Sequence, residues 1–507
     1  MRQSIRRLIP EPRQFSLFCR KWVHVNRCSA LIHCESGQPA QTFPRKRTVV
    51  FMRNSSMSVS RRWTALLLLF SAILITTEIA AAQSDTDSKN SRTPAGWGES
   101  PNIVLILSDD QAWTDFGFMG HPVIKTPHLD ALARESYLYT DGYVTTSLCR
   151  PSLASLISGY YPHQHGITGN DPPRGTDRNK MLKHIDRMPK LPAMLGEKGY
   201  VSLQTGKWWE GAPARGGFTK GMTHGDVSRG GRHGDEGLKI GREGMKPIFD
   251  FLDANKGTPF YLWYAPFMPH TPHNPPQRLL QKYTSPDRPI ELAKYYAMCE
   301  WFDETCGELI DGLSERGLRG NTLIVFVTDN GWIQKTPQTE LPDGWRQPFA
   351  PRSKRSPNEA GLRTPIFFNW PGTISPGVSD APVTALDVVP TMLAAAGLEK
   401  TAAMPGVNLF PDAEPRTDLE DRTLFGEIFA HDLVDIDRPS TSLLYRWCRD
   451  GQWKLILPEG DEEPVQLYDL SVDPHENENL ADEKPELVEN LTAQINAWWD
   501  GETDRLE

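Results

Sequence analysis

The sequence predicts an α/β fold with a large, mostly parallel central sheet flanked by helices, followed by a smaller antiparallel sheet with a terminal helix. Continuous apolar runs, which suit strands buried on both faces of a sheet, occur at 102–108, 201–205, 259–264, 323–328 and 364–369. Helical segments fall between these runs, at 126–136, 191–198, 244–254 and 291–316. Strands that alternate with helices are typical of a parallel sheet covered by helices.

The pattern changes at about residue 420. Short strand candidates then follow one another at 423–428, 444–449, 453–457 and 466–468, and a helix is expected near 485–499. We therefore expect a main domain over 101–420 and a C-terminal subdomain over 421–507. No internal repeat is evident in the sequence.

Three segments precede the predicted main domain. Residues 1–56 are rich in arginine, lack sustained periodicity, and are interpreted as an extension upstream of the true start or as a dispensable leader. Met57 then opens a basic stretch, a short apolar run and a small-residue cleavage site, which is typical of a signal peptide over 57–82. The apolar run is short for a membrane span, so we expect no stable span after cleavage and export to the periplasm or the extracellular space. A retained signal anchor is the alternative, and residues 83–100 are a predicted polar linker.

Charge and cysteine content narrow the classes of function. Residues 1–82 carry 13 Lys and Arg against 3 Asp and Glu, a net charge of +10, so the rest of the chain carries −19 although the whole chain carries −9. A chain this acidic is not expected to bind nucleic acid, and an anionic substrate would need a local basic pocket. Four cysteines lie beyond residue 82, and they indicate no disulfide framework: Cys149, Cys299, Cys306 and Cys448.

Oxygen-donor side chains follow two of the predicted strands. Asp109 and Asp110 come directly after the first strand, and Asp329 and Asn330 follow the strand at 323–328. Ligand sites in open α/β sheets lie at the carboxyl ends of strands. Two adjacent carboxylates repel each other unless a cation holds them. Four hard oxygen donors predict a Ca²⁺ site, with Mg²⁺ as the alternative.

Cys149 lies where the chain is expected to turn into a helix. It opens the run Cys-Arg-Pro-Ser-Leu at 149–153, in which Pro151 suits a first helical turn. Free N–H groups and the positive end of a helix dipole make such a position suitable for a tetrahedral oxyanion. The alternative is that Cys149 is a small buried hydrophobe.

Three further motifs carry basic residues. Lys207 follows a predicted strand in the run Gly-Lys-Trp-Trp-Glu-Gly at 206–211, and His270 follows another in Pro-His-Thr-Pro at 269–272. His270 is a candidate acid because histidine titrates near neutral pH, whereas Lys207 taken alone is a solvated loop lysine. Lys354 begins a third motif, in which Glu359 and Arg363 are expected to form a structural ion pair.

Together these motifs resemble the signatures of the sulfatase family. The run from Cys149 is similar to the family's Cys-x-Pro-Ser-Arg, and the other motifs follow in the family's order over about residues 100–370. A C-terminal stretch extends the resemblance to about residue 480. The resemblance implies an alkaline phosphatase-like fold, sulfatase catalysis within 101–420, and hydrolysis of sulfuric esters.

The resemblance also implies a site. Cys149 would be converted to formylglycine (3-oxoalanine) by a formylglycine-generating or other maturation enzyme, and its hydrate would be the nucleophile. Lys207 and Lys354 would hold the sulfate, and His270 would bind sulfate or protonate the leaving group. Calcium would be bound by five residues: Asp109, Asp110, Cys149, Asp329 and Asn330.

Two positions depart from the family's pattern. Leu153 stands where the family has arginine, and Trp209 stands where it has histidine. A loop over 216–235 is rich in Gly, His and Arg, and Gly lets the backbone approach a ligand closely. We expect His224 or His233 and a nearby arginine, with Arg150 as a candidate, to supply the lost groups; a flexible polar loop is the alternative.

The predicted function is removal of sulfate from a sulfated carbohydrate or an aryl sulfate. Tryptophans in the loops suit stacking on sugar rings, although they could equally be core: Trp208, Trp209, Trp332 and Trp345. A phosphate or phosphonate monoester hydrolase on the same scaffold is one alternative, since the fold alone does not choose the ester. A catalytically silent binder of sulfated glycans, with Cys149 left as a thiol, is another.

Overall fold

The computed structural model describes residues 100–410 and 417–502, which belong to one compact unit of the chain. The expected leader at 1–56, the signal peptide at 57–82 and nearly all of the linker at 83–100 lie outside the described residues. Within the described ranges, no helix has the length and apolar character needed to span a membrane.

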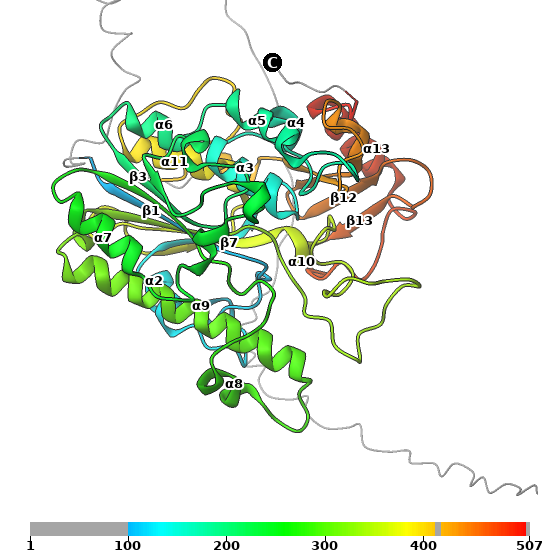
Figure 1. The fold of residues 1–507 in the computed structure, drawn as a ribbon. Helices are drawn as coiled ribbons and strands as arrows, with labels where there is room; N and C mark the ends of the chain where they lie inside the picture. Colours follow the sequence, from blue (N-terminus) through cyan, green and yellow to red (C-terminus); the bar gives the residue numbers. More distant parts are fainter. Residues whose placement is uncertain (1–99, 411–416, 503–507) are drawn as a thin grey trace, which may run out of the picture. The chain divides into compact units, whose positions relative to one another are not determined.

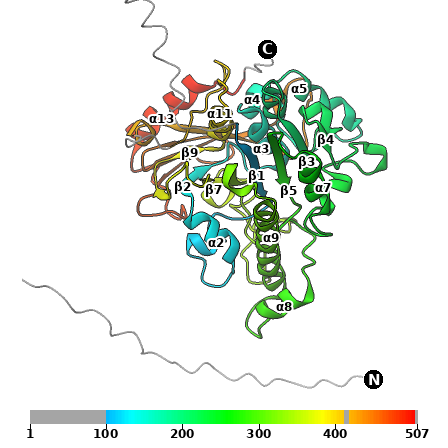
Figure 2. The same cartoon turned by 90° about the vertical axis from the view of Figure 1, so that its left-hand side faces the viewer.

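The central sheet is mixed but mostly parallel, as predicted. Its strand order is β4-β3-β5-β1-β6-β7-β2-β8, with β9 also paired to β2, and Figure 2 shows most of this sequence from β2 to β4. The pairs from β4 to β6 are parallel, whereas β7 is antiparallel to both β6 and β2. The five predicted strands occupy adjacent places in the sheet: β3 Val201–Gly206, β5 Phe260–Ala265, β1 Asn102–Ser108, β6 Thr322–Thr328 and β7 Arg363–Asn369.

Four strands of this sheet were not predicted. They are β2 Tyr137–Tyr143, β4 Lys220–Gly221, β8 Gly377–Ser379 and β9 Val383–Thr384. Three of them are only two or three residues long, and β2 contains Thr, Asp and Gly in place of a continuous apolar run. Their pairing depends on partners distant in sequence, so a local pattern does not show it.

Helices cover both faces of the sheet, because alternate side chains of each strand point to opposite faces. Leu105 and its odd-numbered neighbours on β1 share one hydrophobic cluster with residues of α3 Cys149–Ser158, α6 Leu191–Gly196 and α11 Val388–Ala395. Val104 and Ile106 pack on the other side against α2 Pro127–Arg134, α7 Lys246–Ala254 and α9 Ile290–Glu315. Figure 1 shows these two helical layers above and below the strands. The four predicted helices are present in these layers as α2, α6, α7 and α9.

The C-terminal part forms the predicted antiparallel sheet with a helix. Strands β10 Leu424–Phe429, β11 Leu443–Asp450, β12 Trp453–Pro458 and β13 Gln466–Asp469 pair in order. Helix α13 Pro485–Trp498 packs Leu491 and Ile495 on one face of this sheet. Trp447 and Ile456 on the other face belong to the same cluster as the central sheet. Five further short α-helices lie in the described ranges: α4 Pro162–His165, α5 Lys183–Asp186, α8 Gln277–Tyr283, α10 Glu359–Leu362 and α12 Thr417–Glu420.

A buried lysine on the C-terminal sheet joins it to the central sheet. Lys454 on β12 is 0% exposed, and its Nζ lies 2.8 Å from Glu359 Oε1 and 2.9 Å from Glu476 Oε1. Glu359 begins α10 directly before β7, so the ion pair connects the two sheets. The expected pair of Glu359 with Arg363 is only a distant one at 3.9 Å, because Arg363 donates to Asp141 instead.

We predict that Lys454→Met lowers the free energy of unfolding by about 3–5 kcal/mol, since it leaves two buried carboxylates without their shared cation. Chemical denaturation followed by tryptophan fluorescence measures this loss. Lys256→Met, which removes an exposed lysine paired at 3.5 Å with Asp253, is the control and should change stability by less than about 0.5 kcal/mol. Equal losses in the two variants would contradict a role for Lys454 in joining the sheets.

Candidate active site

The predicted site residues meet at one edge of the central sheet. Asp109 and Asp110 follow β1, Asp329 and Asn330 follow β6, and Lys207 follows β3. These strands run parallel, so their carboxyl ends lie at the same edge. The backbone N–H of Asp109 donates to Met268 O at 3.1 Å, which brings the segment of His270 beside β1.

Two buried lysines neutralise part of the acidic cluster. Lys207 Nζ donates to Asp109 Oδ1 at 2.6 Å and to Asp329 Oδ2 at 3.1 Å. Lys354 Nζ donates to Asp110 Oδ1. Both lysines are buried, at 1% and 6% exposure. The structure therefore brings the two predicted cationic groups to the predicted carboxylates.

The acidic side chains also hold one another in place. The backbone N–H of Asp110 donates to Asp329 Oδ1 at 3.0 Å, and Asn330 Nδ2 donates to Asp110 Oδ1 at 2.7 Å. Asp110 has a φ of 63°, in the left-handed region that few residues other than glycine adopt. Such strained backbone persists where surrounding contacts over-determine it, as they do here.

Three buried oxygens of the cluster accept no hydrogen bond from any described residue: Asp109 Oδ2, Asp110 Oδ2 and Asn330 Oδ1. Atoms of Asp109, Asp110, Cys149 and His270 that could bind a metal lie within 4.8 Å of one another. Buried polar atoms are normally satisfied, and carboxylate and amide oxygens are the donors that Ca²⁺ and Mg²⁺ take. The donor set fits a divalent cation.

The charge on the cluster supports the same conclusion. Burial raises the pKa of Asp109 well above its usual value, against the attraction of Lys207. Burial also acts on Asp110, but Lys354 and His270 outweigh it and lower the pKa of that carboxyl. Ionising all three carboxylates against two lysines gives one net negative charge, which the raised pKa of Asp109 opposes and which a divalent cation would reverse.

Cys149 is the first residue of α3 and is 1% exposed. Burial raises the pKa of its thiol, against the opposing effect of Lys207 and Lys354. An unmodified Cys149 is therefore a neutral thiol near pH 7, and the thiolate is the reactive form of cysteine. The position of Cys149 and the residues around it suit a reacting group, whereas its neutral thiol is a poor nucleophile.

His270 lies beside the same carboxylate as Lys354. Its Nε2 is 3.4 Å from Asp110 Oδ2, and its Nδ1 lies 2.6 Å from Thr271 O. A carbonyl oxygen only accepts, so Nδ1 carries the proton and Nε2 of the neutral ring is an acceptor. Burial lowers the pKa of His270 well below its usual value. His270 must therefore gain a proton at Nε2 before it can act as an acid.

His224, His233 and Arg150, which were expected to replace the groups lost at positions 153 and 209, have different surroundings in the structure. His233 packs its ring 5.2 Å from Trp209 and 5.2 Å from Phe267, and Phe267 stacks on His270 at 4.1 Å. His224 instead lies 3.4 Å from Asp235 within its own loop. Of the two histidines, His233 is the one in contact with residues of the site.

Arg150 has other partners. Its guanidinium donates to Glu210 through Nε at 2.6 Å and Nη2 at 2.8 Å. The same group donates to the backbone oxygens of Gly169 and Met181. A buried arginine with every guanidinium nitrogen engaged is a structural ion pair rather than a free cation at the site.

The positions that depart from the family's pattern are apolar and buried. Leu153 is 3% exposed within the core cluster of α3. The guanidinium groups of Arg178 and Arg232 each lie 5.0 Å from a ring centroid of Trp209. Trp208 and Trp332 are also buried, which leaves Trp345 as the half-buried member of the four candidate sugar-stacking tryptophans.

Arg355 is a site residue that the sequence did not single out. Its backbone has a φ of 66°, and its N–H donates to Ser147 O at 2.9 Å, two residues before Cys149. Burial lowers the pKa of Arg355, and the largest opposing influences on that pKa are Cys149 and Asp110. The available signal was its place directly after Lys354.

Comparison with known proteins agrees with this geometry. A family model described as "Sulfatase" matches residues 101–398, and one described as "N-sulphoglucosamine sulphohydrolase, C-terminal" matches 352–499. Arylsulfatase A of Bos taurus is 28% identical over 454 residues, which cover 76% of this chain and 85% of that protein. N-acetylgalactosamine-6-sulfatase of Homo sapiens is 29% identical over 357 residues, covering 62% and 66%.

Solved structures share the fold. Ps i-CgsB in complex with k-i-k-neocarrahexaose superposes with a TM-score of 0.63 at 24% identity, covering 80% of this chain and 94% of that one. The phosphonate monoester hydrolase of Agrobacterium radiobacter gives a TM-score of 0.59 at 18% identity, covering 78% and 95%. At these identities the likeness concerns the fold.

We predict that Asp110→Asn weakens Ca²⁺ binding by at least about tenfold, because it removes one charge and one oxygen ligand without changing the shape of the side chain. Isothermal titration of metal-free protein with Ca²⁺ measures the change. Asp311→Asn, at an exposed position on α9, is the control and should bind like the wild type. Unchanged affinity in Asp110→Asn would show that the cluster is not the cation site.

We predict that His233→Ala lowers the turnover of an aryl sulfate by at least about tenfold, because the rings that support His270 lose their packing partner. Burial lowers the pKa of His233 to about 3, so the ring is neutral above that pH. The ratio of wild-type to variant turnover should therefore be constant between pH 5 and 9.

His224→Ala is the matched control and should retain turnover within about twofold, since its contacts lie within its own loop. Equal losses in the two histidine variants would contradict a distinct role for His233. A ratio that changes with pH would contradict its neutrality.

Proposed function

This chain belongs to the sulfatase family and is a sulfuric ester hydrolase, and we propose that it removes sulfate from a sulfated carbohydrate or an aryl sulfate. We propose that it uses a formylglycine formed from Cys149 and a divalent cation, Ca²⁺ or alternatively Mg²⁺. The observation that carries this proposal is the buried cluster in which unsatisfied oxygens of Asp109 and Asp110 lie beside Cys149, with Asn330 bonded to Asp110.

The two lysines have the donors that a sulfuryl group requires. An ammonium group has three N–H donors, and the contacts with carboxylates use two on Lys207 and one on Lys354. Their remaining donors can bind sulfuryl oxygens in a site shielded from water, where such contacts stabilise developing charge most strongly. With its carboxylates ionised and no cation bound, the cluster would carry a net negative charge and repel an anionic ester. That charge therefore favours binding of the divalent cation, which the free oxygens of the cluster also fit.

The hydrated formylglycine would supply an oxygen nucleophile for sulfur. The divalent cation would stabilise charge on the sulfuryl oxygens. Residues of this chain do the rest. Asp109, Asp110, Asp329 and Asn330 would hold the cation, and Lys207 and Lys354 would orient the ester. His270, once protonated at Nε2, would give that proton to the leaving oxygen, a contribution of roughly 10²–10⁴-fold in rate.

Maturation and export belong to the same proposal. Leu153 replaces the family's arginine in a buried position, so we propose that a formylglycine-generating or other maturation enzyme converts Cys149 without a charge at 153. The predicted signal peptide supports export to the periplasm or the extracellular space. We propose no nucleic-acid partner, in keeping with the acidic chain.

Sulfated carbohydrates are the substrate class that the relatives favour. One relative is named an N-acetylgalactosamine-6-sulfatase, another an ulvan-active sulfatase, and Ps i-CgsB was solved with k-i-k-neocarrahexaose. Arylsulfatase A keeps an aryl sulfate among the proposed substrates.

A second candidate is hydrolysis of a phosphate or phosphonate monoester. The specific observation in its favour is the shared fold with a phosphonate monoester hydrolase. Metal and lysines stabilise phosphoryl and sulfuryl oxygens by the same electrostatics, so the geometry favours neither ester by itself.

We predict that the protein purified from its native host hydrolyses 4-nitrophenyl sulfate faster than 4-nitrophenyl phosphate. Cys149→Ala should abolish turnover of both esters, because it removes the precursor of the nucleophile. Mass measurement of the tryptic peptide that contains Cys149 should show conversion of the thiol to an aldehyde.

Each alternative gives a different result in the same experiment. Faster turnover of the phosphate would favour the phosphoester hydrolase. An intact thiol together with tight binding of sulfated glycans and no turnover would favour the silent binder.

A further inference from the structure

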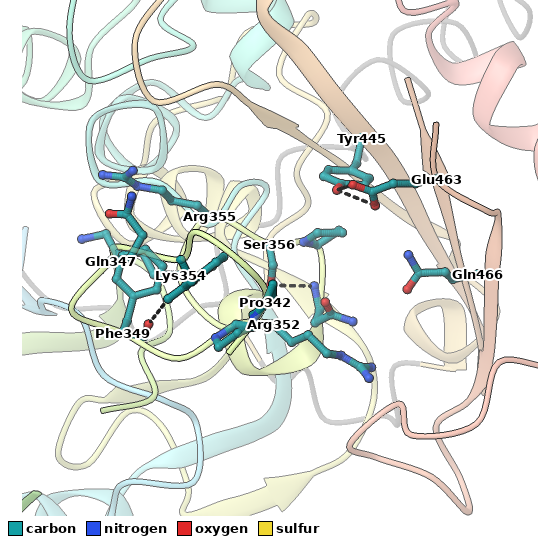
Figure 3. Close-up of a pocket in the computed structure, with 14 residues that line it drawn as sticks. Pro342, Gln347, Phe349, Arg352, Lys354, Arg355, Ser356, Tyr445, Glu463 and Gln466 are labelled. Carbon is teal, nitrogen blue, oxygen red and sulfur yellow. Dashed lines mark hydrogen bonds between the residues drawn. The ribbon is translucent and has the colours of Figure 1, made fainter. Parts of the chain in front are cut away.

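The loop that carries Lys354 brings a second basic side chain, Arg355, to the site. Both residues line a pocket with a volume of about 490 Å³ between this loop and the C-terminal sheet. Figure 3 shows the two residues on one side of the pocket and Gln466 of β13 on the other. Because Lys354 Nζ donates to Asp110, Arg355 belongs to the segment that enters the acidic cluster.

Two hydrogen bonds fix the backbone of this segment beside Cys149. The N–H of Arg355 donates to Ser147 O at 2.9 Å, and Ser147 Oγ donates to Ser356 O at 2.7 Å. Ser147 lies two residues before Cys149, so the loop is attached to the segment that carries the precursor of the nucleophile. Burial lowers the pKa of Arg355, and Cys149 and Asp110 oppose that change most strongly, which agrees with this placement.

The backbone of Arg355 has a conformation that favours glycine. Its φ of 66° lies in the left-handed region, where a residue with a side chain is less stable than glycine. Strained residues of this kind cluster at functional sites, where the surrounding contacts hold them in place. The side chain packs on Phe349, whose ring centroid lies 5.7 Å from the guanidinium carbon. A function of the guanidinium would account for an arginine at this position.

The guanidinium of Arg355 donates to no acceptor in the described part of the chain. Of its three nitrogens only Nε is sealed from water, so the two Nη groups carry the donors that are open to a ligand. Two carboxylates whose charge acts on Arg355 already have other partners: Asp171 pairs with Arg178 and Arg232, and Asp432 pairs with His431.

The other cations near Cys149 are committed to protein groups. Lys207 and Lys354 donate to carboxylates of the acidic cluster. Helix α3 supplies no free cation, because Leu153 is apolar and Arg150 is held in its buried ion pair. Of these basic residues, Arg355 is the one whose guanidinium or ammonium donors have no partner among the described residues. A guanidinium group binds oxyanions through paired N–H donors.

We propose that Arg355 is an additional catalytic residue, whose Nη groups donate to the sulfuryl oxygens of the ester held beside residue 149. The guanidinium takes the place of the cation that Leu153 does not supply. It stabilises the negative charge that develops on those oxygens during the reaction. This inference rests on the proposed sulfatase function and adds to it a residue that no motif of the sequence indicated.

The test removes the side chain and leaves the backbone contact in place. Arg355→Gly keeps the N–H that donates to Ser147 and suits the left-handed conformation, so its melting temperature should stay close to that of the wild type. Arg355→Gln removes the charge but keeps a polar side chain, and Arg355→Lys keeps a cation. Arg346→Gln, at an exposed arginine of the same loop outside the pocket lining, is the control.

Two measurements are made on each protein. The first is kcat/KM for 4-nitrophenyl sulfate, which should fall at least about a hundredfold in Arg355→Gly and Arg355→Gln. Arg355→Lys should retain at least about tenfold more of it than Arg355→Gln, because it keeps the charge. The second is calorimetric titration with sodium sulfate in the presence of Ca²⁺, which requires no turnover. Both uncharged variants should bind sulfate at least about tenfold more weakly, and the control should match the wild type in both measurements.

Failure of the inference is distinguishable from failure of the proposed function. No turnover of 4-nitrophenyl sulfate or of any sulfated sugar by wild-type protein with a converted Cys149 would overturn the function, while the sulfate titration would still test Arg355. Turnover and sulfate affinity that match the control in both uncharged variants would overturn the role of Arg355. Equal losses in Arg355→Lys and Arg355→Gln would overturn it too, since the charge would then not be the property that matters.

Discussion

The burial of three carboxylates at one edge of the sheet is the constraint on which the site depends. Asp109, Asp110 and Asp329 lie out of water at 3%, 1% and 1% exposure, where like charges repel strongly. Lys207 and Lys354 offset part of this repulsion, and their ion pairs with the carboxylates hold the two lysines in place. The remaining negative charge and the unsatisfied oxygens fit a divalent cation, and this fit connects the fold of the edge to the chemistry that we propose.

The second level of organisation is the contact between the two sheets. Lys454 on the C-terminal sheet pairs with Glu359, which begins α10 directly before β7 of the central sheet. The same contact places Tyr445 and Gln466 across a pocket from Lys354 and Arg355. The C-terminal subdomain therefore contacts the segment that follows Lys354 and forms one wall of this pocket.

The two departures from the family's pattern have a local structural basis. Trp209 packs against Arg178 and Arg232, both of which pair with Asp171. Its ring in turn contacts His233, which lies against the aromatic support of His270. The chain thus has a packed aromatic and cationic layer at the place where the family has a histidine. Arg150, in contrast, is engaged with Glu210 and adds no cation to the layer.

The sequence by itself determined the five adjacent strands of the central sheet, the antiparallel C-terminal sheet, and the clustering of Asp109, Asp110, Asp329 and Asn330. These features follow from local patterns, because buried parallel strands are continuously apolar and their carboxyl ends share one edge. Tertiary structure alone decided the reversed direction of β7 and the pairing of β2. It also decided the choice of His233 over His224, the partners of Arg150, and the place of Arg355. Each of these depends on contacts between segments far apart in the chain, whose distances no local spacing encodes.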